Sequence, residues 1–246
     1  MTKTYNPYPS VKLNYGKDNK WFNVLFEAIN RVDSSYIEYE LADIDNVNAT
    51  GVVNTFEHVE RVFAYELYRQ WANILEQNGI KNIVLNGEIG KCLKDEISKI
   101  PEYSRKNVFP DLVLHQSQSG EGNQLMICEI KRTKDLDGEK IFEDLHKISC
   151  YLDREIFWKE PFKYGVFIIM GKDAHLSMIK IEENTVSCFI EGQKSIEDYK
   201  KDKKFKKKFK DIVCISYNGI TIEYQTLDIL FKDIISKPKT RKTRKS

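Results

Sequence analysis

The sequence predicts an α/β domain in which helices flank a central mixed β-sheet. From Thr55 to Gly171, a long helix pattern is followed by three short apolar segments, a second amphipathic helix and a fourth apolar segment. Strands mixed with packing helices in this order favour an α/β arrangement. The chain has 246 residues, 41% of them hydrophobic and 31% charged, which is typical of a soluble globular protein with one sizeable core.

The helices are predicted from apolar residues spaced at i, i+3/i+4 and i+7. This spacing predicts a helix over Asn19–Val32, and residues 36–41 suit a short strand. The clearest helix begins at Thr55, which suits an N-cap, and Gly79 closes its end. Residues 137–156 repeat the amphipathic pattern and predict a helix directly after the third strand.

Short apolar runs bounded by turn formers predict the strands. In the core they lie in 81–91, in the two arms of 109–132 and in 163–171. Beyond the core, weak alternation over 176–192 suggests a hairpin, and 194–210 is predicted to be a basic helix. The segment IVCISYNGITIEY contains Asn-Gly, a strong signal for a two-stranded hairpin.

These patterns divide the chain into four parts. We expect an N-terminal extension with one helix (1–54), the α/β core (55–171), a C-terminal addition of hairpins and a basic helix packed on the core (172–236), and a disordered basic tail (237–246). No apolar run approaches the ~18 residues that span a bilayer, and the N-terminus lacks the apolar region of a signal peptide. The five widely spaced cysteines favour a reducing cytoplasm over a disulfide framework or a structural zinc site.

The charge is unevenly distributed although its formal sum is only +2. From Lys200 onward there are 15 Lys and Arg against 5 Asp and Glu, which leaves 24 against 32 in the preceding residues. A basic C-terminal part can contact nucleic acid, but a solvated surface is an equally ordinary explanation.

The segment FPDLVLHQSQSGEGNQLMICEIKR, residues 109–132, is predicted to form one hairpin. Pairing symmetric about Gly120 places Asp111 opposite Glu129, about 5 Å apart at Cβ. Glu129 and Lys131 then project from the same face of the sheet, while Cys128 and Ile130 take the other. A slip of one residue would separate the two carboxylates.

Two carboxylates this close repel each other unless a cation lies between them. Mg²⁺, or Mn²⁺ in its place, suits oxygen ligands, and the carbonyl of Ile130 could add a third ligand to Asp111 and Glu129. Lys131 could then orient water or stabilise charge on an attacked phosphate. The alternative is structural: Asp111 caps a strand, and Glu129 pairs with Lys131 or Arg132 on the surface.

Pro110-Asp111 followed by Glu129-Ile130-Lys131 resembles the active-site signature of the PD-(D/E)xK nuclease superfamily. The resemblance covers roughly half of the chain, 55–171, and implies a restriction-endonuclease-like core with Asp on the second core strand and Glu-x-Lys on the third. It implies a Mg²⁺-dependent hydrolase, commonly an endonuclease, that cleaves DNA more often than RNA. Some members of the superfamily have lost activity.

Further residues could support such a site. The superfamily often adds an acid from the first core helix, and Glu66 and Glu60 flank opposite sides of its apolar stripe, with Glu66 slightly favoured because it stands among aromatic residues. Either acid could instead pair with Arg69 or Arg61. Glu88 could be a further metal ligand, Gln70 could hydrogen-bond substrate, and His115 could support Asp111. Phosphate contacts could come from Lys147 and from the basic segment with Lys204, Lys207 and Lys208.

We therefore expect a nuclease for which nucleic acid, DNA rather than RNA, is the partner, in defence, repair or mobile-element processing. A homodimer would bring two sites to a duplex. Two other functions stay open: a catalytically inactive module of the same fold that binds nucleic acid or a partner protein, and a structural subunit of a larger assembly.

Overall fold

The computed structural model describes residues 19–38, 55–87, 110–116, 124–152, 161–179 and 209–230. Its helices are α1 (Asn19–Arg31), α2 (Ser35–Glu38), α3 (Thr55–Gln77), α4 (Gly138–Tyr151) and α8 (Leu227–Leu230), with single 3-10 turns η4 (Thr133–Asp135) and η5 (Leu176–Met178). Its strands are β1 (Ile83–Gly87), β2 (Leu112–Gln116), β3 (Gln124–Arg132), β4 (Tyr164–Met170), β5 (Ile212–Tyr217) and β6 (Ile222–Thr226). None of these helices is long and apolar enough to cross a membrane.

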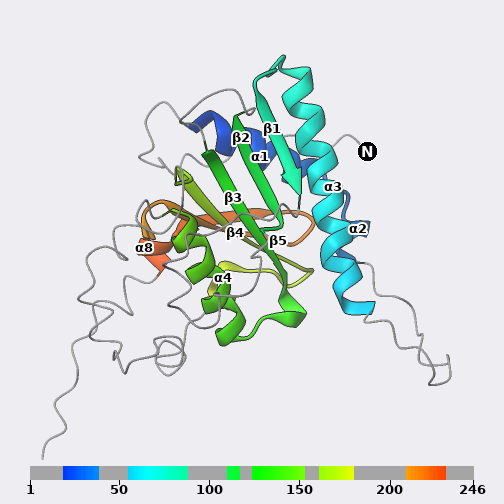
Figure 1. The fold of residues 1–246 in the computed structure, drawn as a ribbon. Coiled ribbons are helices and arrows are strands. Elements are labelled where there is room, and N and C mark those ends of the chain that lie inside the picture. Colours follow the sequence, from blue (N-terminus) through cyan, green and yellow to red (C-terminus); the bar gives the residue numbers. More distant parts are fainter. Residues whose placement is uncertain are drawn as a thin grey trace, which may run out of the picture.

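The six strands form one mixed sheet in the order in which they follow along the chain, β1-β2-β3-β4-β5-β6 (Figure 1). Strand β2 pairs antiparallel with both β1 and β3. Strand β4 pairs parallel with both β3 and β5, and β6 pairs antiparallel with β5. Helix α4 is the crossover that parallel β3 and β4 require. The predicted α/β class with a central mixed sheet is therefore confirmed.

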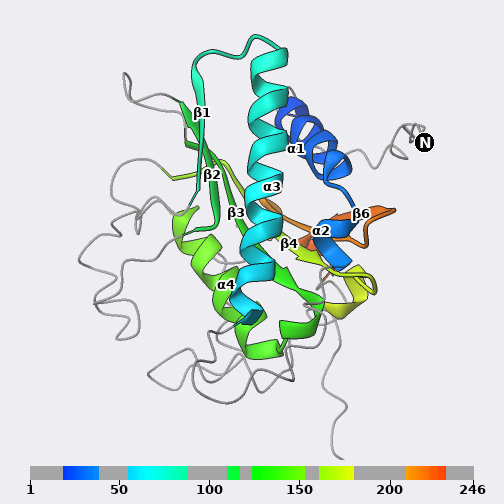
Figure 2. The same ribbon diagram turned by 90° about the vertical axis from the view of Figure 1, so that its right-hand side faces the viewer.

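Helices cover both faces of this sheet (Figure 2). Helices α1 and α3 share one hydrophobic core with the side chains of one face, and α4 packs on the opposite face. Successive side chains of a strand alternate between faces, so along β3 Cys128 and Ile130 join the core under α1 and α3, whereas Ile127 joins the core under α4. The same alternation places Glu129 and Lys131 on the α4 face, as predicted.

Helix α3 is held by the apolar stripe that its spacing predicted. Phe63, Leu67 and Ile74 are fully buried, and Trp71 adds the largest buried side chain of this face. The helix ends at Gln77, and Gly79 follows with a φ of 64°. Glycine adopts this left-handed conformation without the steric cost that a Cβ would impose, which explains why the chain turns there toward β1.

The short strand predicted over residues 36–41 is wrong for its described part, because Ser35–Glu38 form α2. Asp33 starts this turn: its side chain accepts from the amide of Ser35, and its carbonyl accepts from that of Tyr36. An aspartate that accepts hydrogen bonds from the backbone amides that follow it favours a helical turn over an extended strand. The apolar alternation that suggested a strand is too short to outweigh this cap.

The Asn-Gly hairpin is confirmed as β5 and β6. Asn218 accepts hydrogen bonds from the amides of Ile220 and Thr221, and Gly219 takes a φ of 89°. By contrast, the hairpin predicted over 176–192 begins with the turn η5 rather than with a strand, and its remainder from 180 lies outside the described residues, as do 194–208 of the predicted basic helix. Helix α8 was not predicted.

Candidate active site

The site begins with the register of β2 and β3. The paired Cα positions are Leu112 with Cys128, Val113 with Ile127 and Leu114 with Met126. Continued by one position, this register sets Asp111 across from Glu129, as the symmetric hairpin predicted. The pairing shifts only at the far end, where His115 lies opposite Gln124.

Asp111 lies just before the start of β2. At this end of β2, strand β3 continues past its neighbour (Figure 1). Oδ2 of Asp111 accepts a hydrogen bond of 2.7 Å from the backbone amide of Ile130, in place of the strand partner that β2 no longer supplies. The amide and carbonyl of one strand residue point to the same side of the strand. The carbonyl of Ile130 therefore points to the same side of β3 as Asp111, in the region that lies before the start of β2.

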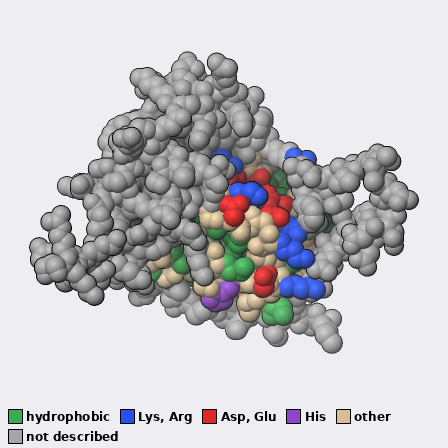
Figure 3. Space-filling view, turned by 90° about the horizontal axis from the view of Figure 1, so that it is seen from below, with side chains coloured by type: hydrophobic (Ala, Val, Ile, Leu, Met, Phe, Trp, Pro, Cys, Tyr) green, Lys and Arg blue, Asp and Glu red, His purple; other side chains and the backbone are tan. Residues whose placement is uncertain are grey.

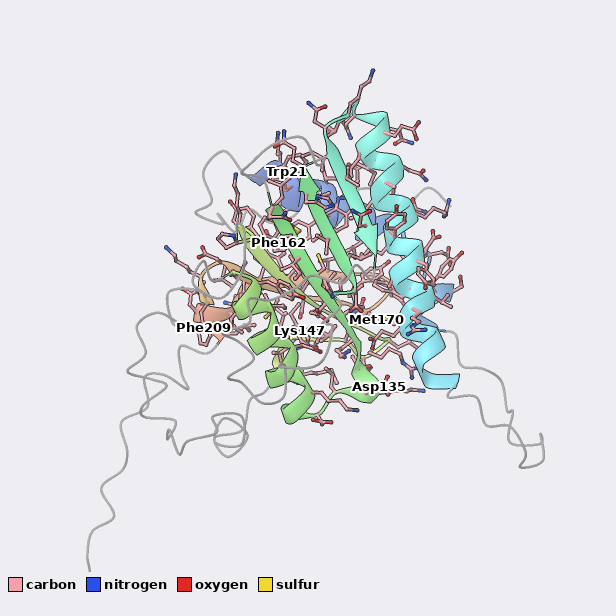
Figure 4. All side chains as sticks on the ribbon, viewed as in Figure 1. Trp21, Asp135, Lys147, Phe162, Met170 and Phe209 are labelled. Atoms are coloured by element: carbon pink, nitrogen blue, oxygen red, sulfur yellow. The ribbon has the colours of Figure 1, made fainter. Side chains whose placement is uncertain are left out.

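Glu129 projects toward α4, where Lys147 contacts it and Asp144 contacts Lys147 in turn. Lys147 lies where α4 faces β3 (Figure 4), and its Nζ is 2.6 Å from Oε2 of Glu129 and 3.1 Å from Oδ1 of Asp144. Glu129 is only 1% exposed, so its carboxylate has exchanged water for this ammonium group. Apolar side chains of α4, namely Ile141, Leu145 and Ile148, fix the helix against the same face of the sheet.

Lys131 joins the two helices at the end of β3. Its Nζ is 3.1 Å from Oε1 of Glu60, which comes from the start of α3, and 3.5 Å from Oδ2 of Asp144. At the molecular end seen from below, acidic and basic side chains lie next to one another (Figure 3). The group formed by Glu60, Asp111, Glu129, Lys131, Asp144 and Lys147 is called the carboxylate–lysine cluster below.

Burial sets the electrostatics of the carboxylates. It raises the pKa of Glu129 well above its ordinary value, against the opposing attraction of Lys147. Burial likewise raises the pKa of Asp111 and of Glu60, although Lys131 lowers both in part. Removing a carboxylate from water disfavours its charged form, so the two lysines do not fully replace the hydration that these acids have lost.

The two lysines respond in the opposite direction. Burial alone would lower the pKa of Lys131, but the surrounding carboxylates, Asp144 foremost, outweigh it and raise that pKa. The pKa of Lys147 is raised in the same way, mainly by Glu129. Both side chains are therefore ammonium ions at neutral pH, and neither can serve as a general base.

The cluster can accommodate further positive charge. With every group ionised, its four acids and two lysines carry a net charge of −2. Within the described residues, Oε1 of Glu129 and Oδ2 of Asp144 are buried without a hydrogen bond. Buried polar atoms are ordinarily paired, and an absent ion or water is one cause of an exception. Both the charge and the oxygen donors fit a divalent cation such as Mg²⁺.

The acids are nevertheless not gathered as a finished metal site. Across the described ranges, no group of three or more His, Cys, Asp or Glu side chains is arranged to hold a metal ion. The reason is visible in the contacts, because the ammonium groups of Lys131 and Lys147 stand between the carboxylates. A divalent cation would have to move at least one of them.

Glu66, the acid favoured from the sequence, does not reach the cluster. Its carboxylate accepts hydrogen bonds from Arg69 at 2.6 and 2.7 Å and from Gln70 at 2.7 Å. These partners lower its pKa, Arg69 contributing most. Glu66 is therefore paired within its own helix, and Glu60 is the acid of α3 that contacts Lys131. Gln70 is engaged by Glu66 rather than directed at the cluster.

His115 is held at the other end of β2. Its Nε2 accepts from Asn86 of β1 at 2.6 Å, and its Nδ1 donates to the carbonyl of Gln116 at 2.9 Å. A position four residues along a strand is about 13 Å away, so the shared face does not bring His115 to Asp111. Glu88, Lys204, Lys207 and Lys208 lie outside the described residues.

Asp144 is the cluster residue that the sequence reasoning missed. It stands three residues after Ile141 and four before Ile148, within the apolar stripe of α4. An acid at such a position must be buried and therefore needs a partner. That pattern, together with Lys147 one turn later, could have indicated a charged pair facing Glu129.

Comparison with protein-family models, with curated proteins and with solved structures finds no match to this chain.

Proposed function

We propose that the chain is a metal-dependent nuclease of the PD-(D/E)xK type that hydrolyses phosphodiester bonds in nucleic acid, DNA rather than RNA. The observation that carries the proposal is the register that sets Asp111 across from Glu129, on the strand that also carries Lys131, where β3 runs past the start of β2. In the sequence these residues were two short motifs 18 positions apart, and chance matches to such motifs are common. The strand register and the hydrogen bond from Ile130 to Asp111 support the proposal, because they bring the two motifs together in the fold.

The fold supports the same proposal. The order α3-β1-β2-β3-α4-β4, with antiparallel β1 to β3 and a parallel β4, agrees with the restriction-endonuclease-like core that the signature implies. Glu129 lies on the third of these strands, as in the family pattern, and Asp111 lies one residue before the second strand, on which that pattern places its Asp. We assign the finer fold on this agreement of element order and motif position.

In this proposal, Asp111, Glu129 and the carbonyl of Ile130 hold Mg²⁺, or Mn²⁺ in its place. The chemistry that such an ion supplies is Lewis-acid stabilisation of the charge that develops on the attacked phosphate. The chain itself contributes oxygen donors of the kind that this ion prefers, on strands rigid enough to hold their spacing.

Lys131 acts on the substrate as a cation. Because its pKa is raised, its ammonium group can orient the attacking water and stabilise negative charge on the phosphate, but cannot remove a proton. Glu60 holds that ammonium group in place from α3. Lys147 and the basic segment with Lys204, Lys207 and Lys208 would add contacts to the phosphate backbone, whose affinity should fall as salt rises.

The test is cleavage of single- and double-stranded DNA and RNA by the purified full chain with Mg²⁺ or Mn²⁺. Asp111→Ala and Lys131→Ala should each lower the rate by about 10²-fold or more, the usual loss when a charge-stabilising group is removed. Lys140→Ala is the matched control, because Lys140 lies on α4 with its side chain 57% exposed and pairs with Asp137. If the Asp111 and Lys131 variants cleave as fast as the wild type, the assignment is wrong.

A catalytically inactive module of the same fold is the second candidate. It is favoured by the internal pairing of the acids with Lys131 and Lys147, which already lowers the repulsion that a metal would relieve. Nucleic-acid binding that survives Asp111→Ala, together with no metal-dependent cleavage by the wild type, would support this candidate. Cytoplasmic location and a homodimer stay predictions from the sequence.

A further inference from the structure

Lys147 forms an ion pair with Glu129, a carboxylate that binds the metal ion in the proposed function. Its ammonium group lies 2.6 Å from Oε2 of Glu129, and its other carboxylate contact is Oδ1 of Asp144 at 3.1 Å. Two cations cannot share one carboxylate at short range without strong repulsion. Either the ion pair between Lys147 and Glu129 prevents metal binding, or the metal ion displaces Lys147 from Glu129.

We propose that Lys147 is an internal counter-ion of Glu129 that a divalent cation displaces, and that Asp144 retains the displaced ammonium group beside the phosphate to be attacked. The inference rests on the proposed nuclease function and deepens it, because it assigns Lys147 and Asp144 a joint positioning role. The ion exchanged is a hard divalent cation, Mg²⁺ or Mn²⁺.

The residual charge favours exchange over a permanent ion pair. Lys147 satisfies only Oε2 of Glu129, and Oε1 of the same group is buried without a hydrogen bond in the described part of the chain. A divalent cation brings the two positive charges that the cluster lacks. If Lys147 remains within the cluster during the exchange, all six charged groups are balanced.

Asp144 is suited to hold Lys147 during that exchange. The two residues are three positions apart on α4, so their side chains lie on the same side of the helix. Asp144 also lies 3.5 Å from Lys131 through its other oxygen, and thus links the two ammonium groups. The flexible stem of Lys147 allows its ammonium group to leave Glu129 while keeping this contact, and the side chain is 16% exposed, which leaves it a path toward substrate.

The experiment titrates Mn²⁺ into the EDTA-treated full chain, without nucleic acid, and follows heat of binding and melting temperature. It compares the wild type with Lys147→Met, which keeps the length of the side chain but removes its charge. Lys140→Met is the control, because Lys140 stands two turns earlier on the same helix and pairs with Asp137 outside the cluster.

If Mn²⁺ has to displace Lys147 from Glu129, the Lys147→Met variant should bind Mn²⁺ about fivefold or more tightly than the wild type. This change in affinity lies within the usual range of coupling between two binding events. Without metal, this variant should melt lower than the control, and Mn²⁺ should stabilise it by the larger increment. Its cleavage should still fall, because the phosphate contact is lost. General structural damage would weaken Mn²⁺ binding, not tighten it.

Equal or weaker Mn²⁺ binding by Lys147→Met overturns the exchange. If that variant does not fold in EDTA, recovery of its folded circular-dichroism signal on adding Mn²⁺ supports the proposal, and failure to recover contradicts it. The two proposals fail separately. Tighter Mn²⁺ binding with no cleavage by the wild type would contradict only the nuclease function, whereas Mg²⁺-dependent cleavage with unchanged affinity in Lys147→Met would contradict only the exchange.

Discussion

At the scale of single residues, Glu129 is the most deeply buried acid among the residues that the structure describes. It is 1% exposed, it has one close ammonium partner, and one of its oxygens is buried without a hydrogen bond in the described part of the chain. An unpaired buried acceptor costs about 1–3 kcal/mol. Such a group persists where function needs it, and this cost agrees with its proposed role as a metal ligand.

Glu129 also predicts how stability depends on pH. Its pKa is raised in the fold above the ordinary value of 4.5, so the folded chain binds this proton more tightly than the unfolded chain does. The stabilisation is fully present below pH 4.5 and is lost as pH rises through the raised pKa. In EDTA, the melting temperature of the wild type should therefore fall relative to that of Glu129→Gln as the pH rises from 4.5 through the raised pKa of Glu129.

Thermal melts of the two proteins across this range, in one set of buffers, give the comparison. Saturating Mg²⁺ should reduce the difference, because a bound cation stabilises the ionised carboxylate. Melting temperatures that stay parallel in EDTA would show that Glu129 does not titrate with the predicted sign.

Glu60 and Glu66, both on α3, give a paired prediction. Glu60→Gln should lower cleavage by about 10- to 100-fold, the usual effect of removing a group that orients a functional side chain. Glu66→Gln should leave cleavage close to that of the wild type, because its contacts go to Arg69 and Gln70. Rates of metal-dependent cleavage measure both, and a larger loss in Glu66→Gln than in Glu60→Gln would reverse the assignment.

These residues show which features of the candidate site can be predicted from the sequence. Helical geometry placed Glu60 and Glu66 on opposite sides of one apolar stripe, so only one of them could face β3. Which one depends on where the start of α3 lies relative to the end of β3, a tertiary relation that periodicity does not contain. Asp144 was missed because its contact with Lys131 joins α4 to β3, and a contact between separate elements leaves no local pattern in the sequence.

At the scale of elements, the site depends on how closely α4 lies against β4. Gly165 has no side chain, and a Cβ built there would lie 2.1 Å from Cγ2 of Ile148, which is fully buried on α4. The helix can therefore approach β4 only because this position is glycine. The same helix carries Asp144 and Lys147, so its distance from the sheet sets theirs from Glu129.

Gly165→Ala should accordingly lower the free energy of unfolding by about 1–3 kcal/mol, the typical cost of overpacking a core. Gly87→Ala on β1 is the control, because a Cβ there would lie an ordinary 3.6 Å from its nearest atom, the backbone oxygen of Asp111. Urea denaturation compares the two variants. Equal stabilities would mean that α4 moves away freely, and the cluster geometry would then not be fixed by this contact.

The elements themselves were largely predictable, for identifiable reasons. Helices α1, α3 and α4 have strong apolar periodicity, and β5 and β6 are joined by Asn-Gly, so local sequence determines them. Helix α2 was mistaken for strand because the cap made by Asp33 outweighs a short alternating pattern. The close packing enabled by Gly165 is a contact between distant segments, which local patterns do not record.

At the scale of the whole molecule, the cluster lies where several elements end together. Residues of β3 and α4 meet the start of α3 beyond the end of β2, so four segments distant in the sequence each supply charge to one place. The hairpin register could be predicted because Gly120 centres a symmetric sequence. The convergence of the helices could be expected only through the resemblance to a known nuclease core.

The proposed function depends on whether a divalent cation binds where these elements converge. The most direct measurement is anomalous scattering from crystals of the full chain soaked in millimolar Mn²⁺. We predict a manganese peak in contact with Asp111 and Glu129, with the ammonium group of Lys147 no longer within hydrogen-bond distance of Glu129. Well-diffracting crystals with no manganese at these two carboxylates, and with Lys147 still paired to Glu129, would contradict the metal-dependent site.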